Sequence, residues 1–190
     1  MSRYTLALPF LLACSAATVR AQGADSLDLK AAALVRGHYL ADMDSTHVKI
    51  VALAKAIPAD KYGWRPGPGV RSVSEVLMHV AGEWYFFGPM SLAGKPPADF
   101  LKTGQKPAER LAELEKTTSK SDVLAELDKS WAYNRQQFLA ADVSKMTGRY
   151  KPWGVDIVEA TLGMTGDQHE HLGQLIAYAR SLGVKPPWSK

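Results

Sequence analysis

Four segments of the chain repeat apolar residues at intervals of three and four positions, which is typical of an α-helix that buries one face. They cover approximately residues 27–57, 72–88, 119–140 and 155–182. No stretch keeps the strict alternation of apolar and polar residues that a β-strand would show. Four amphipathic helices joined by loops, one of them long, predict an all-α domain with the architecture of a four-helix bundle.

The connections between these helices contain residues that begin and end helices. Pro58 ends the first helix, and Ser72-Val-Ser-Glu75 has the sequence of a capping box, which predicts the start of the second. Gly88-Pro89 predicts the end of the second helix. The long connection over residues 91–119 is rich in turn-forming residues and predicts a loop with a short helical turn over Ala108–Lys116. The mixed charges of that turn indicate a solvated face.

The last helix carries two polar residues on the face that the apolar pattern predicts to be buried. Asp167 and His171 are one turn apart, about 40° around the helix axis. They share a line with Met164, Leu175 and Tyr178. A carboxylate and an imidazole in a core are unfavourable unless both are compensated. Either a divalent metal ion or a direct Asp–His hydrogen bond would compensate them.

Two other helices carry further polar residues near their apolar stripes. His79 and Glu83 form a second pair four residues apart on the second helix, and His47 lies on the stripe of the first. Bundles build metal sites from inward side chains on facing helices, so that His79 together with Asp167 and His171 forms a candidate ligand set. By itself, His47 is more typical of a core histidine that bonds a neighbouring helix.

The first 21 residues have the pattern of a secretory signal peptide. Arg3 precedes an apolar run over residues 4–17, and Val19-Arg20-Ala21 is a small-residue cleavage site. The run is too short to span a bilayer, so we expect a mature chain of residues 22–190 that is periplasmic or secreted and has no stable membrane span. Cleavage before Cys14, which would produce a lipoprotein, is the alternative.

Composition and charge exclude several classes of protein. Hydrophobic residues make up 46% and charged residues 22% of the chain, which are ordinary values for one globular domain. The net charge is +4, and two arginines lie in the predicted leader, so the mature domain is close to neutral. It has no basic block that would bind nucleic acid. Cleavage after Ala21 removes the only cysteine and with it any disulfide or thiolate ligand.

Two motifs together resemble the DinB/YfiT-like family. The first is Trp64-Arg-Pro-Gly-Pro-Gly-Val-Arg-Ser-Val-Ser-Glu-Val-Leu-Met-His79, and the second is His171-Leu-Gly-Gln-Leu-Ile-Ala-Tyr-Ala-Arg-Ser-Leu-Gly-Val-Lys-Pro-Pro-Trp188. The resemblance spans nearly the whole mature chain. It implies a four-helix bundle, often a homodimer, that binds a divalent metal through one histidine of the second helix and two histidines of the last. Better-characterised relatives are thiol S-transferases.

The residues of this chain differ at one position from the three ligands that the resemblance implies. His79 and His171 match two of the family's ligands, whereas Asp167 stands where the family has its third histidine. The substitution leaves either a two-histidine, one-aspartate site or a site that has lost its metal. Zinc, nickel, manganese and iron would all accept the former.

These observations support two functions of different classes. The first is an exported metalloenzyme, a transferase or hydrolase of an unknown small molecule, with its ion on His79, Asp167 and His171. Glu83 would be a fourth ligand or a group that orients the ligands, and His47 an orienting or acid/base group. The second is a non-catalytic exported bundle that binds a small ligand or dimerises, in which Asp167 and His171 form a structural polar pair.

Overall fold

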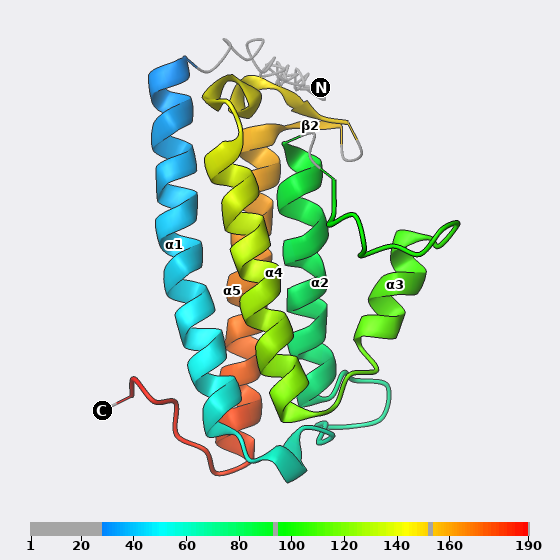
Figure 1. Cartoon of the computed structure of the whole chain (residues 1–190). Coiled ribbons are helices and arrows are strands. Elements are labelled where there is room, and N and C mark those ends of the chain that lie inside the picture. Colours follow the sequence, from blue (N-terminus) through cyan, green and yellow to red (C-terminus); the bar gives the residue numbers. More distant parts are fainter. Residues whose placement is uncertain (1–27, 93–94, 152–153, 190) are drawn as a thin grey trace, which may run out of the picture.

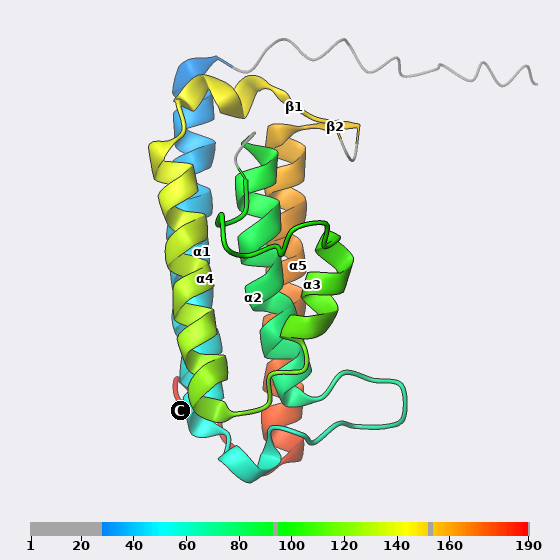
Figure 2. The same ribbon diagram turned by 45° about the vertical axis from the view of Figure 1, so that its right-hand side comes forward.

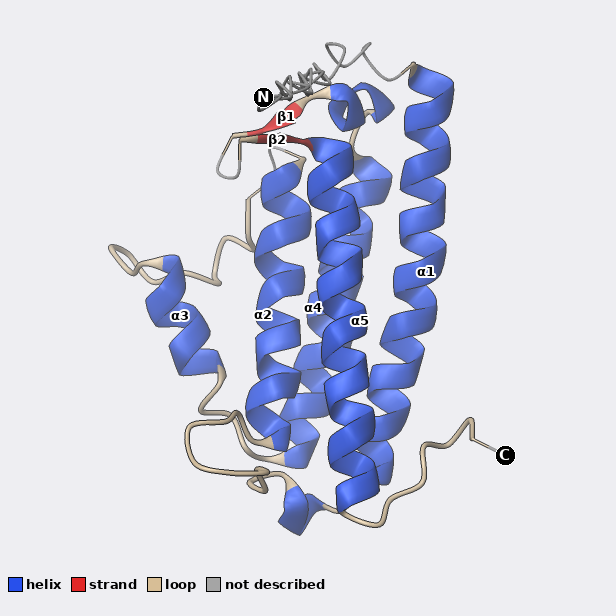
Figure 3. Cartoon of the chain, turned by 180° about the vertical axis from the view of Figure 1, so that it is seen from behind, coloured by secondary structure: helices blue, strands red, loops and turns tan. Residues whose placement is uncertain are grey.

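The computed structural model describes residues 28–92, 95–151 and 154–189 of the chain (Figure 1). Each of two helices, α1 and α2, packs against both α4 and α5, which closes the four around one core (Figure 3). The predicted all-α four-helix bundle is therefore confirmed. The predicted signal peptide lies outside the described residues. The bounds of the four long helices are α1 Leu29–Ala56, α2 Val73–Ser91, α4 Lys120–Ala140 and α5 Ile157–Ser181.

Shorter elements connect the bundle helices. Helix α3 (Pro107–Leu114) lies outside the bundle beside α2, in the long connection between α2 and α4 (Figure 2). It occupies most of the short helical turn that the sequence predicts. The remaining elements are the 3-10 turns η1 (Ala59–Lys61) and η2 (Val143–Thr147) and the antiparallel pair β1 (Arg149–Tyr150) and β2 (Val155–Asp156).

The core is one continuous cluster of apolar side chains, contributed by the bundle helices at the predicted intervals of three and four residues. Burial of this surface is the dominant favourable contribution to folding. Among the described residues, no helix combines the length and apolar character that crossing a bilayer requires. The largest fully buried side chains include Trp84, Tyr62, Tyr85, Phe138, Met43, Ile50, Leu77 and Leu127.

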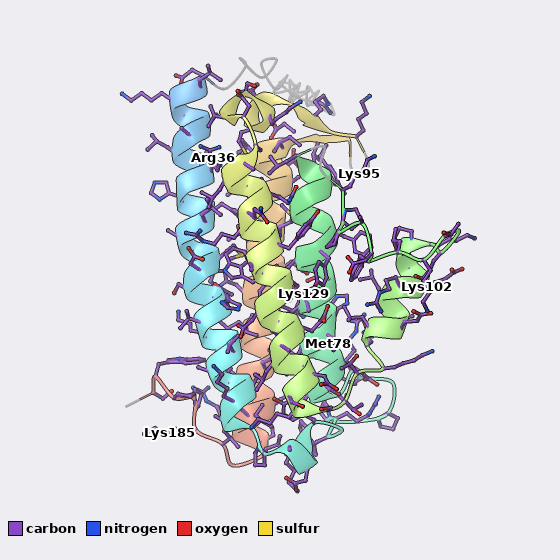
Figure 4. All side chains as sticks on the ribbon, viewed as in Figure 1. Arg36, Met78, Lys95, Lys102, Lys129 and Lys185 are labelled. Carbon is purple, nitrogen blue, oxygen red and sulfur yellow. The ribbon has the colours of Figure 1, made fainter. Side chains whose placement is uncertain are left out.

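Side chains satisfy several helix ends, where backbone groups have no partner within the helix. The predicted capping box is present at the start of α2. The Ser72 backbone N–H donates to Glu75 Oε2 at 2.7 Å, and the Glu75 backbone N–H donates to Ser72 Oγ at 3.3 Å. At the end of α4, the guanidinium of Arg36, which Figure 4 labels, donates to the backbone oxygen of Ala141 at 2.8 Å. The capping box therefore fixes where α2 begins. The Arg36 contact holds the end of α4 against α1.

Two helix boundaries differ from the prediction. Helix α2 continues to Ser91, because Pro89 removes one hydrogen bond but keeps a φ that a helix allows. Helix α5 begins at Ile157, because residues 155–156 pair with β1 before the helix starts. Gly154 adopts a φ of 68°, a conformation that favours glycine, at the turn between the two strands. Strands of two residues are too short to show the alternation that would have predicted them.

Gly88 allows α2 to lie close to Asn134 of α4. Asn134 is buried, its Nδ2 donates to the Trp84 backbone oxygen at 3.1 Å, and its Oδ1 accepts from the Tyr39 hydroxyl at 3.2 Å. A Cβ atom on Gly88 would lie 2.3 Å from Nδ2 of Asn134. The glycine therefore leaves room for a buried, hydrogen-bonded amide that joins α1, α2 and α4.

We expect Gly88→Ala to lower the free energy of unfolding by about 1–3 kcal/mol, because the added methyl displaces Asn134 from its hydrogen bonds. Gly37→Ala is the matched control, since nothing lies within 4 Å of the Cβ position of Gly37 in α1. This control should be neutral or stabilising by up to about 1 kcal/mol. Urea denaturation measures both variants, and an undiminished stability of Gly88→Ala would contradict the close approach of α2 and α4.

Candidate metal centre

Helices α2 and α5 bring three potential metal ligands to one point between them. His79 and Glu83 are one turn apart on α2, and His171 faces them from α5. One ligand atom from each side chain lies within 4.8 Å of the other two. The two imidazole rings are 5.0 Å apart between centroids and nearly perpendicular, at 79°. Two helices that are neighbours in the bundle (Figure 3) thus place two imidazoles and a carboxylate within reach of a single ion.

Glu83 occupies the centre of this group and is only 6% exposed. Its Oε1 lies 3.1 Å from His79 Nε2. Its Oε2 accepts a hydrogen bond from Gln168 Nε2 at 2.6 Å and lies 3.8 Å from His171 Nε2. Because Gln168 is itself buried in α5, the carboxylate is held in position between the two helices. Both histidines therefore direct Nε2 towards the same carboxylate.

The second nitrogen of each imidazole has a partner outside this group. His79 Nδ1 lies 3.1 Å from Oε1 of Glu115, the residue that follows α3. His171 Nδ1 lies 3.2 Å from Oε1 of Gln174, in the next turn of α5. Carboxylate and amide oxygens only accept hydrogen bonds, so both Nδ1 atoms are the donors. The Nε2 atom of each ring is then available to bind a cation in place of a proton.

Asp167 is a fourth polar group at the edge of this cluster. Its Oδ2 is 3.7 Å from His171 Nε2, which is too far for a hydrogen bond. This oxygen is buried, and the carboxyl group interacts with that of Glu83. Burial, and secondly the negative charge of Glu83, raise the pKa of Asp167 from 3.8 to about 6. Two ionised carboxylates side by side are unfavourable, and a cation between them would remove this cost.

The residues present therefore fit a divalent ion. Two carboxylates and two imidazole Nε2 atoms are donors that zinc, nickel, manganese and iron accept. The hydrogen bond to Glu83 is the main reason why the pKa of His79 is raised in spite of its burial. In the protonated form of His79 the Nε2 proton points to Glu83, and metal binding would release it.

The structure places His47 in a different part of the bundle. Its ring lies against Trp84 and Trp131, at centroid distances of 5.5 and 5.9 Å, and its Nε2 lies 3.1 Å from Asp128 Oδ1 on α4. These contacts belong to the packing of α1 with α2 and α4, whereas the candidate metal ligands meet between α2 and α5. The orienting or acid/base role predicted for His47 therefore has no support in this geometry. The alternative, a packed histidine that contacts a neighbouring helix, describes it better.

The places of Glu83 and Asp167 in the candidate ligand set are exchanged relative to the prediction. Glu83, predicted as an accessory group, is one of the three residues whose ligand atoms lie closest together, and Asp167 is the peripheral one. The buried line of α5 passes through Gln168, which is 3% exposed, whereas the side chain of Asp167 is 41% exposed. The sequence signal for Gln168 was its place midway between Met164 and Leu172, at intervals of four.

We expect Asp167→Asn to stabilise the metal-free protein at neutral pH. Because the pKa of Asp167 is raised in the folded chain, ionisation of this side chain destabilises the fold. The penalty is absent below the ordinary pKa of 3.8 and complete above about 6. The gain in unfolding free energy should therefore grow between about pH 4 and pH 6 and then stay constant.

Urea denaturation in EDTA across this pH range measures the difference between wild type and Asp167→Asn. Glu170→Gln, on the exposed side of the same helix, is the control for the loss of one negative charge. A gain from Asp167→Asn that is the same at every pH would contradict the raised pKa of this carboxyl group.

Comparison with known proteins bears on the family of the chain. None of the curated proteins shows a significant match to the chain. A family model described as the DinB superfamily matches residues 43–175, which extend from the first bundle helix through His79 and Glu83 to His171 in the last. The match covers more than half of the chain and confirms the resemblance that the two motifs indicate. The chain therefore belongs to the DinB superfamily.

Proposed function

We propose that this protein is an exported enzyme that uses a divalent metal ion to transfer or hydrolyse a group of a small molecule. The observation that carries the proposal is the convergence of His79, Glu83 and His171, whose ligand atoms lie within 4.8 Å of one another. The carboxylate of Asp167 lies beside this group, with Oδ2 3.7 Å from His171 Nε2. Its raised pKa, caused firstly by burial and secondly by the negative charge of Glu83, means that a cation placed there would stabilise its ionised form.

His79, Glu83 and His171 would hold the ion, with Asp167 as the fourth group beside it. Asp167 stands where the DinB/YfiT-like resemblance implies a histidine, and its carboxylate is a chemically suitable replacement. Zinc, nickel, manganese and iron all accept this mixture of nitrogen and oxygen donors. The side chains of His79 and His171 are 21% and 14% exposed, so the site lies just below the surface.

An ion held by these residues would supply Lewis acidity, which lowers the pKa of a bound water or thiol. The protein supplies the orientation of the ligands and a place for the released proton. We assign that proton to Oδ2 of Asp167, which is 3.7 Å from His171 Nε2 and whose pKa is raised to about 6. Glu83 stays fixed meanwhile, because Gln168 bonds the carboxylate from α5.

The destination of the chain and its reaction class rest on the sequence. The leader supports export, with cleavage after Ala21, and lipid attachment at Cys14 is the alternative. The intact mass of the exported chain distinguishes the two, since it begins at Gln22 in one case and at a lipid-modified Cys14 in the other. The thiol S-transferases among DinB/YfiT-like proteins favour a transferase, and hydrolysis is the other reaction that such a centre supports. Homodimerisation stays a prediction.

Zinc-loaded wild-type protein, dialysed without a chelator, is expected to retain about one ion per chain. His171→Ala should lose this ion, because it removes one of three converging ligands. His169→Ala is the matched control. His169 lies on the same helix two residues earlier, and its Nε2 is 2.7 Å from Asp42 Oδ2 on α1, away from the site. Elemental analysis of the metal content per chain is the measurement.

Two results would contradict the proposal. Equal retention of zinc by wild type and His171→Ala would place the ion elsewhere. No retention of zinc, nickel, manganese or iron by the wild type would exclude a metalloenzyme. The non-catalytic bundle, with these side chains as a structural polar network, would then be the better account.

A further inference from the structure

Glu115 reaches the metal centre from outside the four-helix bundle. It directly follows α3, which lies beside α2 and apart from the other helices (Figures 1 and 3). Leu114 is buried, and a Cβ atom on Gly82 of α2 would lie 2.3 Å from a methyl carbon of Leu111. This close attachment of α3 to α2 places the Glu115 carboxylate beside His79, with Oε1 3.1 Å from Nδ1.

A series of hydrogen bonds supports His171 through the equivalent nitrogen. Its Nδ1 lies 3.2 Å from Gln174 Oε1, and Gln174 Nε2 donates to the Tyr178 hydroxyl at 3.0 Å. The Tyr178 hydroxyl donates to the backbone oxygen of Arg71 at 3.1 Å. Arg71 Nε also donates to both oxygens of Glu115, at 3.2 and 3.3 Å. The supports of the two histidines therefore meet at Arg71.

We propose that Glu115 is a positioning residue of the metal centre, which orients His79 for the ion through Nδ1. The inference rests on the proposed function, because it assigns a role toward the ion that His79 would bind. A carboxylate accepts a hydrogen bond and cannot donate one, so Nδ1 carries the proton and Nε2 presents its lone pair to the ion. A carboxylate bonded to the far nitrogen also makes the imidazole a stronger ligand.

An ion pair with Arg71 does not by itself explain the placement of Glu115. The side chains are 24% and 43% exposed, and pairs on the surface contribute little to stability. Glu113 shows what an ordinary acidic residue of this segment does, since it pairs at 3.3 Å with Lys102, whose side chain is 75% exposed. Glu115 instead points to an imidazole whose other nitrogen already faces Glu83.

Zinc affinity of the full mature chain tests this role. Competition with a chromophoric chelator gives the Kd of the wild type and of three variants. Glu115→Ala is expected to weaken zinc binding about 10- to 100-fold. Glu115→Gln keeps an acceptor for Nδ1 and should recover most of the affinity. Glu113→Ala removes a carboxylate from the same segment and should bind zinc as the wild type does.

A spectroscopic measurement separates the orientation of His79 from a general loss of structure. In the zinc-loaded wild type, the Nδ1–H proton of His79 should give an NMR signal, because the hydrogen bond to Glu115 slows its exchange with water. The signal should disappear in Glu115→Ala and persist in Glu113→Ala. Thermal unfolding followed by circular dichroism verifies that each variant is folded.

The outcomes distinguish this proposal from the proposed function. If the wild type binds zinc and His171→Ala does not, but Glu115→Ala keeps the wild-type Kd and NMR signal, the metal centre stands and Glu115 has no positioning role. If Glu115→Gln binds as weakly as Glu115→Ala, charge and not orientation is responsible, and the proposal is overturned. If the wild type binds no divalent ion, both proposals fail.

Discussion

The packing of α2 against α5 depends on the contacts that compensate the buried carboxylate of Glu83. An ionised carboxylate in a protein interior costs several kcal/mol unless hydrogen bonds and opposite charges compensate it. The amide of Gln168 and the imidazole of His79 supply this compensation. Since Gln168 belongs to α5 and His79 to α2, the carboxylate is satisfied only when the two helices pack in one register. The group that is most costly to bury is therefore also the one that specifies how these helices align.

Asp167 adds a second carboxylate at the edge of this arrangement, with Oδ2 3.7 Å from His171 Nε2. Burial, and secondly the negative charge of Glu83, raise the pKa of Asp167, so its ionisation is unfavourable in the metal-free fold. Two carboxylates and two imidazoles at one point form a group that a cation compensates and that apolar packing does not. The cost of keeping them together in the metal-free fold would be recovered when an ion binds.

The apolar periodicity predicted the four helices, and spacings of four residues predicted a polar pair on one face of the second and last helices. The apolar periodicity locates the buried face of a helix only to within about one residue, or 100° around the helix axis. The prediction therefore put Asp167 on the buried line of α5, where the structure has Gln168. Periodicity also does not show which neighbouring helix a side chain faces, so it could not predict that His47 contacts α4. Glu115 is 36 residues from His79, in a segment whose charges predict solvation, so no local pattern indicates their contact.

The hydrogen bonds that meet at Arg71 connect two segments outside the four bundle helices to the candidate metal site. Arg71 ends the loop between α1 and α2, and Glu115 ends the α3 segment, yet together they support both histidines. A four-helix bundle can close its core with short connections, whereas the long connection between α2 and α4 carries the carboxylate that contacts His79. If Glu115 orients His79, docking of α3 on Gly82 and binding of an ion stabilise each other by the same free energy. Release of α3 from α2 would then weaken metal binding without any change in the residues that contact the ion.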